Sequence, residues 1–186
     1  KHIFTDNVVF QFKCTNTIEE QVLENVSVLM EPIEGEDVFE EEMTIPLASM
    51  PLGKPGSTFV SFTRAEGAYV AAKFACILKF TSKEVDPSSG EPEEEGYEDE
   101  YTLEDLDLAM LDFIHTTPMP NFRKVWDGLP EETERVDDYG LGTRESLEEA
   151  VEAVMNILGM QPCEGTEAVP PNARSHTTLL SGVFVG

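Results

Sequence analysis

The chain has few basic residues and no long hydrophobic run. Its 186 residues hold 12 lysines and arginines against 37 aspartates and glutamates, so the formal net charge is −25. A negative field of this size repels phosphate groups and anionic lipid headgroups, which argues against nucleic-acid and membrane-surface binding. No apolar run reaches the roughly 18 residues that a membrane-spanning helix needs, because Lys73 and Lys79 interrupt the densest stretch. We therefore predict a soluble chain without direct membrane insertion.

Cysteine and histidine are also scarce. Three cysteines are an odd number for a disulfide-stapled secreted domain, and Cys14 and Cys76 lie within hydrophobic alternation, which favours free buried thiols in a reducing compartment. The three histidines have no Cys or His partner at metal-ligand spacing, so we predict no metal and no cofactor. Cys163 and His176 could meet in space as nucleophile and base, but no surrounding motif supports this pairing. The sequence therefore predicts no enzyme.

Hydrophobic alternation dominates the first part of the chain. Apolar side chains recur at every second position in residues 8–15, 25–30, 59–62 and 70–80, and prolines and glycines separate several of these runs. A period of two is typical of half-buried strands, and several such strands between turns are typical of an antiparallel β-sandwich. We predict that this sandwich occupies residues 1–111.

A strongly acidic segment interrupts the pattern at residues 86–107. It contains no basic residue, and Pro87, Gly90, Pro92 and Gly96 break any regular element, so its first part is predicted to be a solvated loop. Alternation returns at residues 106–110, which predicts a last strand that leaves the sandwich.

Two helical patterns follow. Apolar residues at positions 122, 125, 126 and 129 predict a short amphipathic helix with Asn121 as its cap. A longer stripe over residues 147–158 begins at Ser146 or Thr143 and ends at Gly159. With a further strand predicted over residues 177–185, this part reads as a smaller α+β region with too few strands to cover its helices. We therefore expect more strands beyond residue 186.

The single tryptophan, Trp126, is the most informative residue of the short helix. It closely follows Arg123 and Lys124, an adjacent basic pair in a strongly acidic chain. A tryptophan on an apolar helical stripe is often a core residue, but an exposed tryptophan beside positive charge would anchor a peptide that carries acidic residues. Composition leaves both interpretations open.

Several segments resemble the appendage domains of coatomer gamma subunits almost segment for segment. They are VVFQFKCTNT, LENVSVLMEP, GEPEEEGYEDEYTLEDLDL, PNFRKVW and LEEAVEAVMNILGMQPCEG. The resemblance covers nearly the whole chain and extends more distantly to the appendages of large clathrin adaptor subunits. It implies a mainly β fold in which an immunoglobulin-like sandwich, residues 1–111, precedes a smaller α+β platform subdomain, residues 112–186.

The resemblance also implies a function. It implies a non-catalytic component of the COPI vesicle coat in Golgi–ER transport, cytoplasmic and peripheral on Golgi membranes, joined to other coatomer subunits through the parent chain. In the family, a platform site around a tryptophan docks accessory proteins, and the partner of the gamma subunit is an ARF GTPase-activating protein. The tryptophan of PNFRKVW corresponds to Trp126, and Phe122 corresponds to a family aromatic that is expected to pack inward beneath it. The expected protein-binding residues are Trp126, Phe122, Arg123 and Lys124.

Two other hypotheses remain. The acidic run could bind basic tails, such as the dilysine ends of membrane cargo, by charge alone. Its candidate residues are Glu93, Glu94, Glu95, Glu98, Asp99 and Glu100. Alternatively, the domain could be purely architectural and have no ligand.

Overall fold

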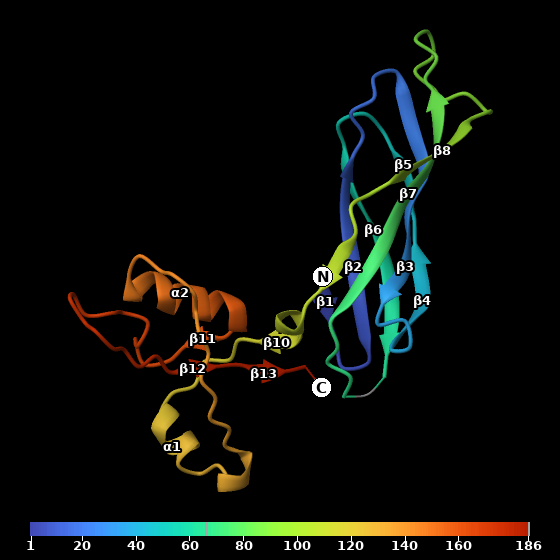
Figure 1. The fold of residues 1–186 in the computed structure, drawn as a ribbon. Coiled ribbons are helices and arrows are strands. Elements are labelled where there is room, and N and C mark those ends of the chain that lie inside the picture. The colour runs from blue at the N-terminus through green and yellow to red at the C-terminus, as the bar shows by residue number, and fades with distance from the viewer. Residues whose placement is uncertain (66, 186) are drawn as a thin grey trace. The chain divides into compact units, whose positions relative to one another are not determined.

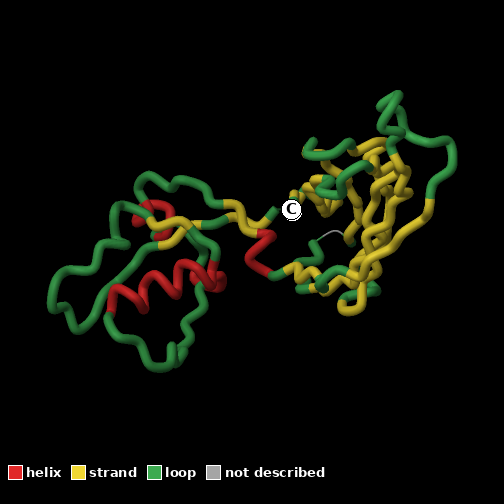
Figure 2. The backbone as a smooth tube through the Cα atoms, turned by 90° about the horizontal axis from the view of Figure 1, so that it is seen from above, coloured by secondary structure: helices red, strands yellow, loops and turns green. Residues whose placement is uncertain are grey.

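The computed structural model describes residues 1–65 and 67–185, which form two compact units, Lys1–Met110 and Leu111–Val185. Figure 1 labels the elements of both units along the chain. Strands make up most of the regular structure of the first unit, whereas both α-helices belong to the second (Figure 2).

The first unit is an antiparallel β-sandwich. One sheet has the strand order β1-β2-β6-β4, and the other has the order β5-β3-β7-β8 with β9 also paired to β7. The strands are β1 (His2–Ile3), β2 (Asn7–Thr15), β3 (Gln21–Glu34), β4 (Phe39–Ile45), β5 (Leu47–Met50), β6 (Pro55–Arg64), β7 (Ala72–Glu84), β8 (Tyr97–Thr102) and β9 (Leu106–Leu108). The predicted sandwich is confirmed. The sequence pattern missed β1, β4 and β5, which lack its alternation.

Four phenylalanines form the centre of the sandwich. The ring of Phe74 lies 5.0 Å from the rings of Phe10 and Phe62 and 5.7 Å from that of Phe39. Phe10 and Phe62 are neighbours in one sheet, whereas Phe74 belongs to the other, so this cluster joins the two layers. All four side chains are buried, and Phe10, Phe62 and Phe74 lie in the runs whose period of two predicted this.

The acidic segment is more ordered than its composition suggests. Residues 97–102 form β8, which pairs with residues 77–82 of β7, so the prediction of a solvated loop holds only for the residues before Tyr97. Backbone hydrogen bonds to β7 outweigh the repulsion between neighbouring carboxylates, and Lys79 Nζ lies 3.4 Å from a Glu100 oxygen. A strand was predicted over residues 106–110, leaving the sandwich. The strand exists as β9, but it pairs with β7 within the sandwich, and Met110 already begins a 3₁₀ turn.

The second unit is a small α+β arrangement, and the predicted region of this class is confirmed. Its elements are η1 (Met110–Phe113), β10 (Ile114–His115), α1 (Phe122–Trp126), η2 (Glu131–Thr133), α2 (Leu147–Leu158), β11 (Gln161–Pro162), β12 (Leu180–Ser181) and β13 (Val183–Phe184). The single strand predicted over residues 177–185 is divided at Gly182, because β12 pairs with β11 and β13 pairs with β10. A Cβ at Gly182 would lie 2.6 Å from Ile114 Cγ2, so glycine permits the close approach at this change of partner.

Helix α2 begins and ends where the sequence predicts. The Ser146 hydroxyl accepts a hydrogen bond from the Glu149 N–H at 3.1 Å, and a Glu149 carboxylate oxygen accepts one from the Glu145 N–H at 2.8 Å. Gly159 closes the helix in the left-handed conformation, with φ 61°. Local sequence is sufficient here because every group of the cap lies within five residues.

We expect Ser146→Ala to lower the free energy of unfolding of the second unit by about 1 kcal/mol, because it removes the side-chain acceptor at the N-terminus of α2. Thermal denaturation followed by circular dichroism measures the change. Ser146→Asp retains an acceptor at this position, so its melting temperature should stay close to that of the wild type. A melting temperature of Ser146→Ala equal to that of the wild type would contradict the role of this cap.

Candidate functional site

Trp126 is an exposed residue at the end of the short helix α1. Its side chain is 51% exposed, so the interpretation of Trp126 as a core residue is wrong. The Phe122 ring stacks on it with a centroid separation of 5.7 Å and an interplanar angle of 19°. Phe122 is half-buried and supports one face of the indole.

The residue that caps α1 differs from the prediction. Asn121 adopts the left-handed conformation, with φ 62°, and its side chain makes no capping hydrogen bond. Instead, Glu164 Oε1 accepts a hydrogen bond from the Phe122 N–H at 3.1 Å. Glu164 is 42 residues away in sequence, so local pattern reasoning does not reveal this contact. The carboxylate also complements the positive end of the helix.

A groove of about 420 Å³ lies beside the Phe122–Trp126 stack. Leu179 and Leu180 provide apolar surface, while Arg123, Asp127 and Glu164 bring charge. Its full lining is Phe122, Arg123, Trp126, Asp127, Glu164, Thr178, Leu179 and Leu180. Of the four predicted residues, three meet at the groove, whereas Lys124 is exposed and does not line it. No local pattern in the sequence indicated that Asp127, Glu164 or residues 178–180 would line the groove.

Thr178 adds an unsatisfied polar group to the lining. Its hydroxyl oxygen is buried and has no hydrogen-bond partner in the described part of the chain. Leaving such a group unpaired costs about 1–3 kcal/mol. A ligand that supplied a donor or an acceptor to this hydroxyl would therefore recover part of that cost.

We expect Glu164→Ala to loosen α1, because a helix of five residues cannot maintain itself without tertiary contacts. Trp126 is the only tryptophan, so its fluorescence reports directly on this helix. The expected result is increased quenching by acrylamide in Glu164→Ala, and much less change in Glu164→Gln, which retains an acceptor oxygen. Glu167→Ala removes an exposed carboxylate three residues away and serves as the control. Equal quenching in all four proteins would contradict the capping role.

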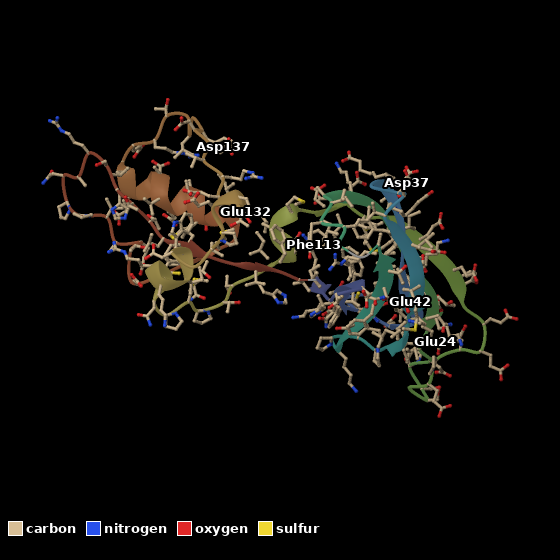
Figure 3. All side chains as sticks on the ribbon, turned by 90° about the horizontal axis from the view of Figure 1, so that it is seen from below. Glu24, Asp37, Glu42, Phe113, Glu132 and Asp137 are labelled. Carbon is tan, nitrogen blue, oxygen red and sulfur yellow. The ribbon has the colours of Figure 1, made fainter. Side chains whose placement is uncertain are left out.

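The acidic candidate residues fall into two groups. Glu98, Asp99 and Glu100 lie on β8 and line a hollow of about 370 Å³ together with Lys79. Glu93, Glu94 and Glu95 lie in the irregular segment before this strand and do not line the hollow. Acidic side chains are also distributed over both units: Figure 3 labels Glu24, Asp37 and Glu42 on the first and Glu132 and Asp137 on the second.

The cysteines and histidines form no catalytic or metal cluster among residues 1–65 and 67–185. Cys163 is buried with its sulfur 3.8 Å from the Gln161 carbonyl oxygen, whereas His176 Nε2 lies 2.6 Å from the Thr166 carbonyl oxygen. All three cysteines are free, and burial raises the pKa of the Cys14 and Cys76 thiols. No group of three or more His, Cys, Asp or Glu side chains in these ranges could hold a metal ion.

Among the described residues, neither α-helix has the length and apolar character of a membrane-spanning helix.

An antiparallel sandwich followed by a small α+β unit is the two-part arrangement that the resemblance to appendage domains implies. Residues 1–109 match the family described as the coatomer gamma subunit appendage platform subdomain, and residues 111–186 match the coatomer subunit gamma-1 C-terminal appendage platform. The chain therefore belongs to the coatomer gamma subunit appendage family, a non-catalytic part of the COPI coat.

Full-length relatives support this assignment. The chain is 55% identical over 186 residues to coatomer subunit gamma-2 of Oryza sativa subsp. japonica, 54% identical to coatomer subunit gamma of Arabidopsis thaliana, and 45% identical over 188 residues to coatomer subunit gamma-1 of Homo sapiens. Each alignment covers 100% of this chain and 21% of the relative. The chain thus spans about a fifth of the length of these relatives.

Proposed function

We propose that this domain recruits an ARF GTPase-activating protein, and other coat accessory proteins, through the groove at Trp126. The observation that carries the proposal is the half-exposed indole, which is supported by Phe122 and lies beside an unfilled groove. Large aromatic side chains in such positions commonly dominate binding energy. Membership of the coatomer gamma family supports a docking role and makes an accessory protein the natural partner class.

The groove favours a short peptide with one apolar anchor and one acidic residue. The anchor would pack on Trp126 against the apolar surface of Leu179 and Leu180, and the acidic residue would face Arg123. Asp127 and Glu164 also line the groove, so it would disfavour a strongly acidic peptide. Of the basic pair Arg123 and Lys124, only the Arg123 guanidinium lines the groove, since Lys124 lies outside it. Binding should weaken only moderately as salt rises.

The cellular setting follows from the same proposal. We place the domain in the cytoplasm, peripheral on Golgi membranes and COPI vesicles, where the parent chain would join it to other coatomer subunits. Individual contacts of this type are weak, and the many copies of a coat would supply avidity. We retain the division into residues 1–111, an immunoglobulin-like sandwich, and 112–186, the platform, as part of this proposal.

The test is recovery of the ARF GTPase-activating protein from cytosol by the immobilised domain and by its Trp126→Ala variant. We expect the variant to lose the partner. Ile157→Ala is the matched control, because Ile157 is also a large exposed apolar side chain of the second unit and does not line the groove. Equal recovery by all three proteins would reject the Trp126 site.

The acidic segment supports a second candidate function, binding of basic tails. One structural observation supports this candidate. Glu98 and Glu100 lie on the same face of β8, and every residue of this strand is exposed. We expect the triple substitution of Glu93, Glu94 and Glu95 by Gln, combined with Glu98→Gln, to reduce binding of a dilysine peptide and to leave the ARF GTPase-activating protein bound. Unchanged binding of the dilysine peptide would reject this function. If the wild-type domain bound neither ligand, the purely architectural role would be favoured.

A further inference from the structure

Strand β8 is an edge of the sheet β5-β3-β7-β8, and within the described chain only β7 pairs with it. The two strands stay in register along the whole of β8, Tyr97–Thr102, without a bulge. By comparison, a bulge interrupts the pairing of the edge strand β4, and the edge strand β5 has only four residues between Pro46 and Pro51. Bulges, prolines and short length usually protect an exposed edge, so β8 is protected by its charge alone.

The hydrogen bond that follows β8 shows which of its backbone groups face the open side. The Leu103 N–H donates to the Cys76 carbonyl oxygen at 2.9 Å, in the register of the β7–β8 pairing. Successive residues of an antiparallel strand turn their N–H and C=O groups to opposite sides, so the odd-numbered residues of β8 face β7, as Leu103 does. The backbone groups of the even-numbered residues, Glu98, Glu100 and Thr102, therefore face away from the sheet. No strand of the described chain pairs with them there.

The two faces of β8 differ in chemistry. Glu98 and Glu100 point to one face, whereas Tyr97 and Tyr101 point to the other, and all four are exposed. Glu100 lies 3.4 Å from Lys79 Nζ, but no basic side chain of the described residues lies within ion-pair distance of Glu98. A hollow of about 370 Å³ adjoins these two carboxylates. A cationic side chain of an added strand would therefore meet an unpaired carboxylate beside open space.

Charge limits what can pair with this edge. A second copy of β8 would place carboxylates opposite carboxylates, and like charges directly opposite each other destabilise a sheet. The net charge of −25 adds repulsion between whole copies. A strand with lysine or arginine on the Glu98 face would instead form cross-strand ion pairs. Apolar side chains between these basic residues would pack beside Tyr97 and Tyr101.

We propose that the open edge of β8 binds a basic segment of a partner protein as an added strand, in which basic and apolar residues alternate. The backbone of the segment pairs with Glu98, Glu100 and Thr102, its basic side chains face the two carboxylates, and its apolar side chains face the tyrosines. The inference rests on the second candidate function, binding of basic tails, and specifies the site and geometry of that binding. It differs from recognition by charge alone because it requires backbone hydrogen bonds.

The test uses the whole domain labelled with ¹⁵N and an octapeptide in which three lysines alternate with three valines between terminal threonines. We expect saturating peptide to slow exchange of the Glu98, Glu100 and Thr102 amide protons about tenfold or more, while amides that already bond to β7 change little. Glu98→Gln should weaken binding about two- to fivefold. Glu40→Gln is the matched control for net charge, because it removes an exposed carboxylate from the edge strand β4 of the other sheet.

Two further peptides separate strand addition from attraction by charge. One is methylated on the backbone nitrogens of its three lysines, and the other on those of its three valines, so all the peptides carry the same charge. In an added strand only one of these two sets of N–H groups points to β8, and which set it is depends on whether the strand runs parallel or antiparallel. We expect one methylated peptide to bind about tenfold more weakly than the other, because it loses the hydrogen bonds to β8.

The possible failures of the inference are distinguishable. Equal affinities of the two methylated peptides would overturn strand addition, and binding of all three peptides would then leave the second candidate function in place. If the unmethylated peptide did not bind at millimolar concentration, both the inference and that function would fail. The Trp126→Ala variant should bind the unmethylated peptide as well as the wild type does, because β8 and Trp126 belong to different units. Loss of binding in this variant would place the peptide at the Trp126 groove instead.

Discussion

We expect Trp126→Ala to weaken binding of the ARF GTPase-activating protein by at least about 2 kcal/mol, or roughly 30-fold, which is the size of effect that defines a binding hot spot. The indole is the largest exposed aromatic surface at the groove, and Phe122 fixes its orientation before any ligand arrives. A preorganised anchor loses little conformational freedom on binding, so most of its buried area contributes to affinity. Isothermal titration calorimetry with the purified partner fragment measures the change.

The same substitution is expected to affect stability only slightly. Because Trp126 is half exposed, its removal costs the stacking on Phe122, about 0.5–1.5 kcal/mol, and creates no internal cavity. A thermal melt of the variant should therefore lie close to that of the wild type. A loss of 3–5 kcal/mol in stability would instead indicate that Trp126 is structural and that the partner binds elsewhere. Ile157→Ala should change neither the affinity nor the melting temperature beyond the effects of an ordinary surface substitution.

We expect Phe74→Ala to lower the free energy of unfolding of the sandwich by about 3–5 kcal/mol. The Phe74 side chain is fully buried and contacts three other phenylalanine rings, all of them from the opposite sheet. Its removal leaves a cavity between two sheets that their hydrogen-bond ladders prevent from collapsing completely. For a unit of about 110 residues, the melting temperature should fall by roughly 12 °C or more, measured by circular dichroism.

Phe4→Ala provides the matched control for the core substitution. It replaces the same residue type in the same unit, but the Phe4 side chain is 54% exposed and contributes no ring contact to the four-phenylalanine cluster. Its melting temperature should change by no more than a few degrees. If Phe4→Ala destabilised the domain as strongly as Phe74→Ala, the placement of the core between the two sheets would be wrong.

Short-range patterns predicted the elements whose stabilising contacts lie nearby. The alternation of residues 8–15 predicted β2, because one face of that strand is buried along its length. The cap of α2 was predictable for a similar reason, since Ser146, Glu149 and Gly159 act on the helix that they flank. The acidic strand β8 was not predictable. Its acidic composition is typical of a solvated loop, and it forms a strand because it pairs with β7. No local signal carries that pairing.

The candidate site shows the same division. Residue types and their order in the sequence identified Trp126, Phe122 and Arg123. Exposure of the indole, the position of Lys124 outside the groove and the lining by residues 178–180 depend on how distant segments meet.

The sequence by itself determined the strand and helix periods, the strongly negative charge and the membership of the coatomer gamma appendage family, because composition, local period and identity are properties of the chain alone. Only the tertiary structure decided which side chains face solvent, which groups cap α1 and where grooves open. The physical reason is that these features arise from contacts between residues far apart in sequence. Glu164 and Phe122 show this clearly: they are separated by 42 residues, yet a single hydrogen bond between them orients the helix that presents Trp126.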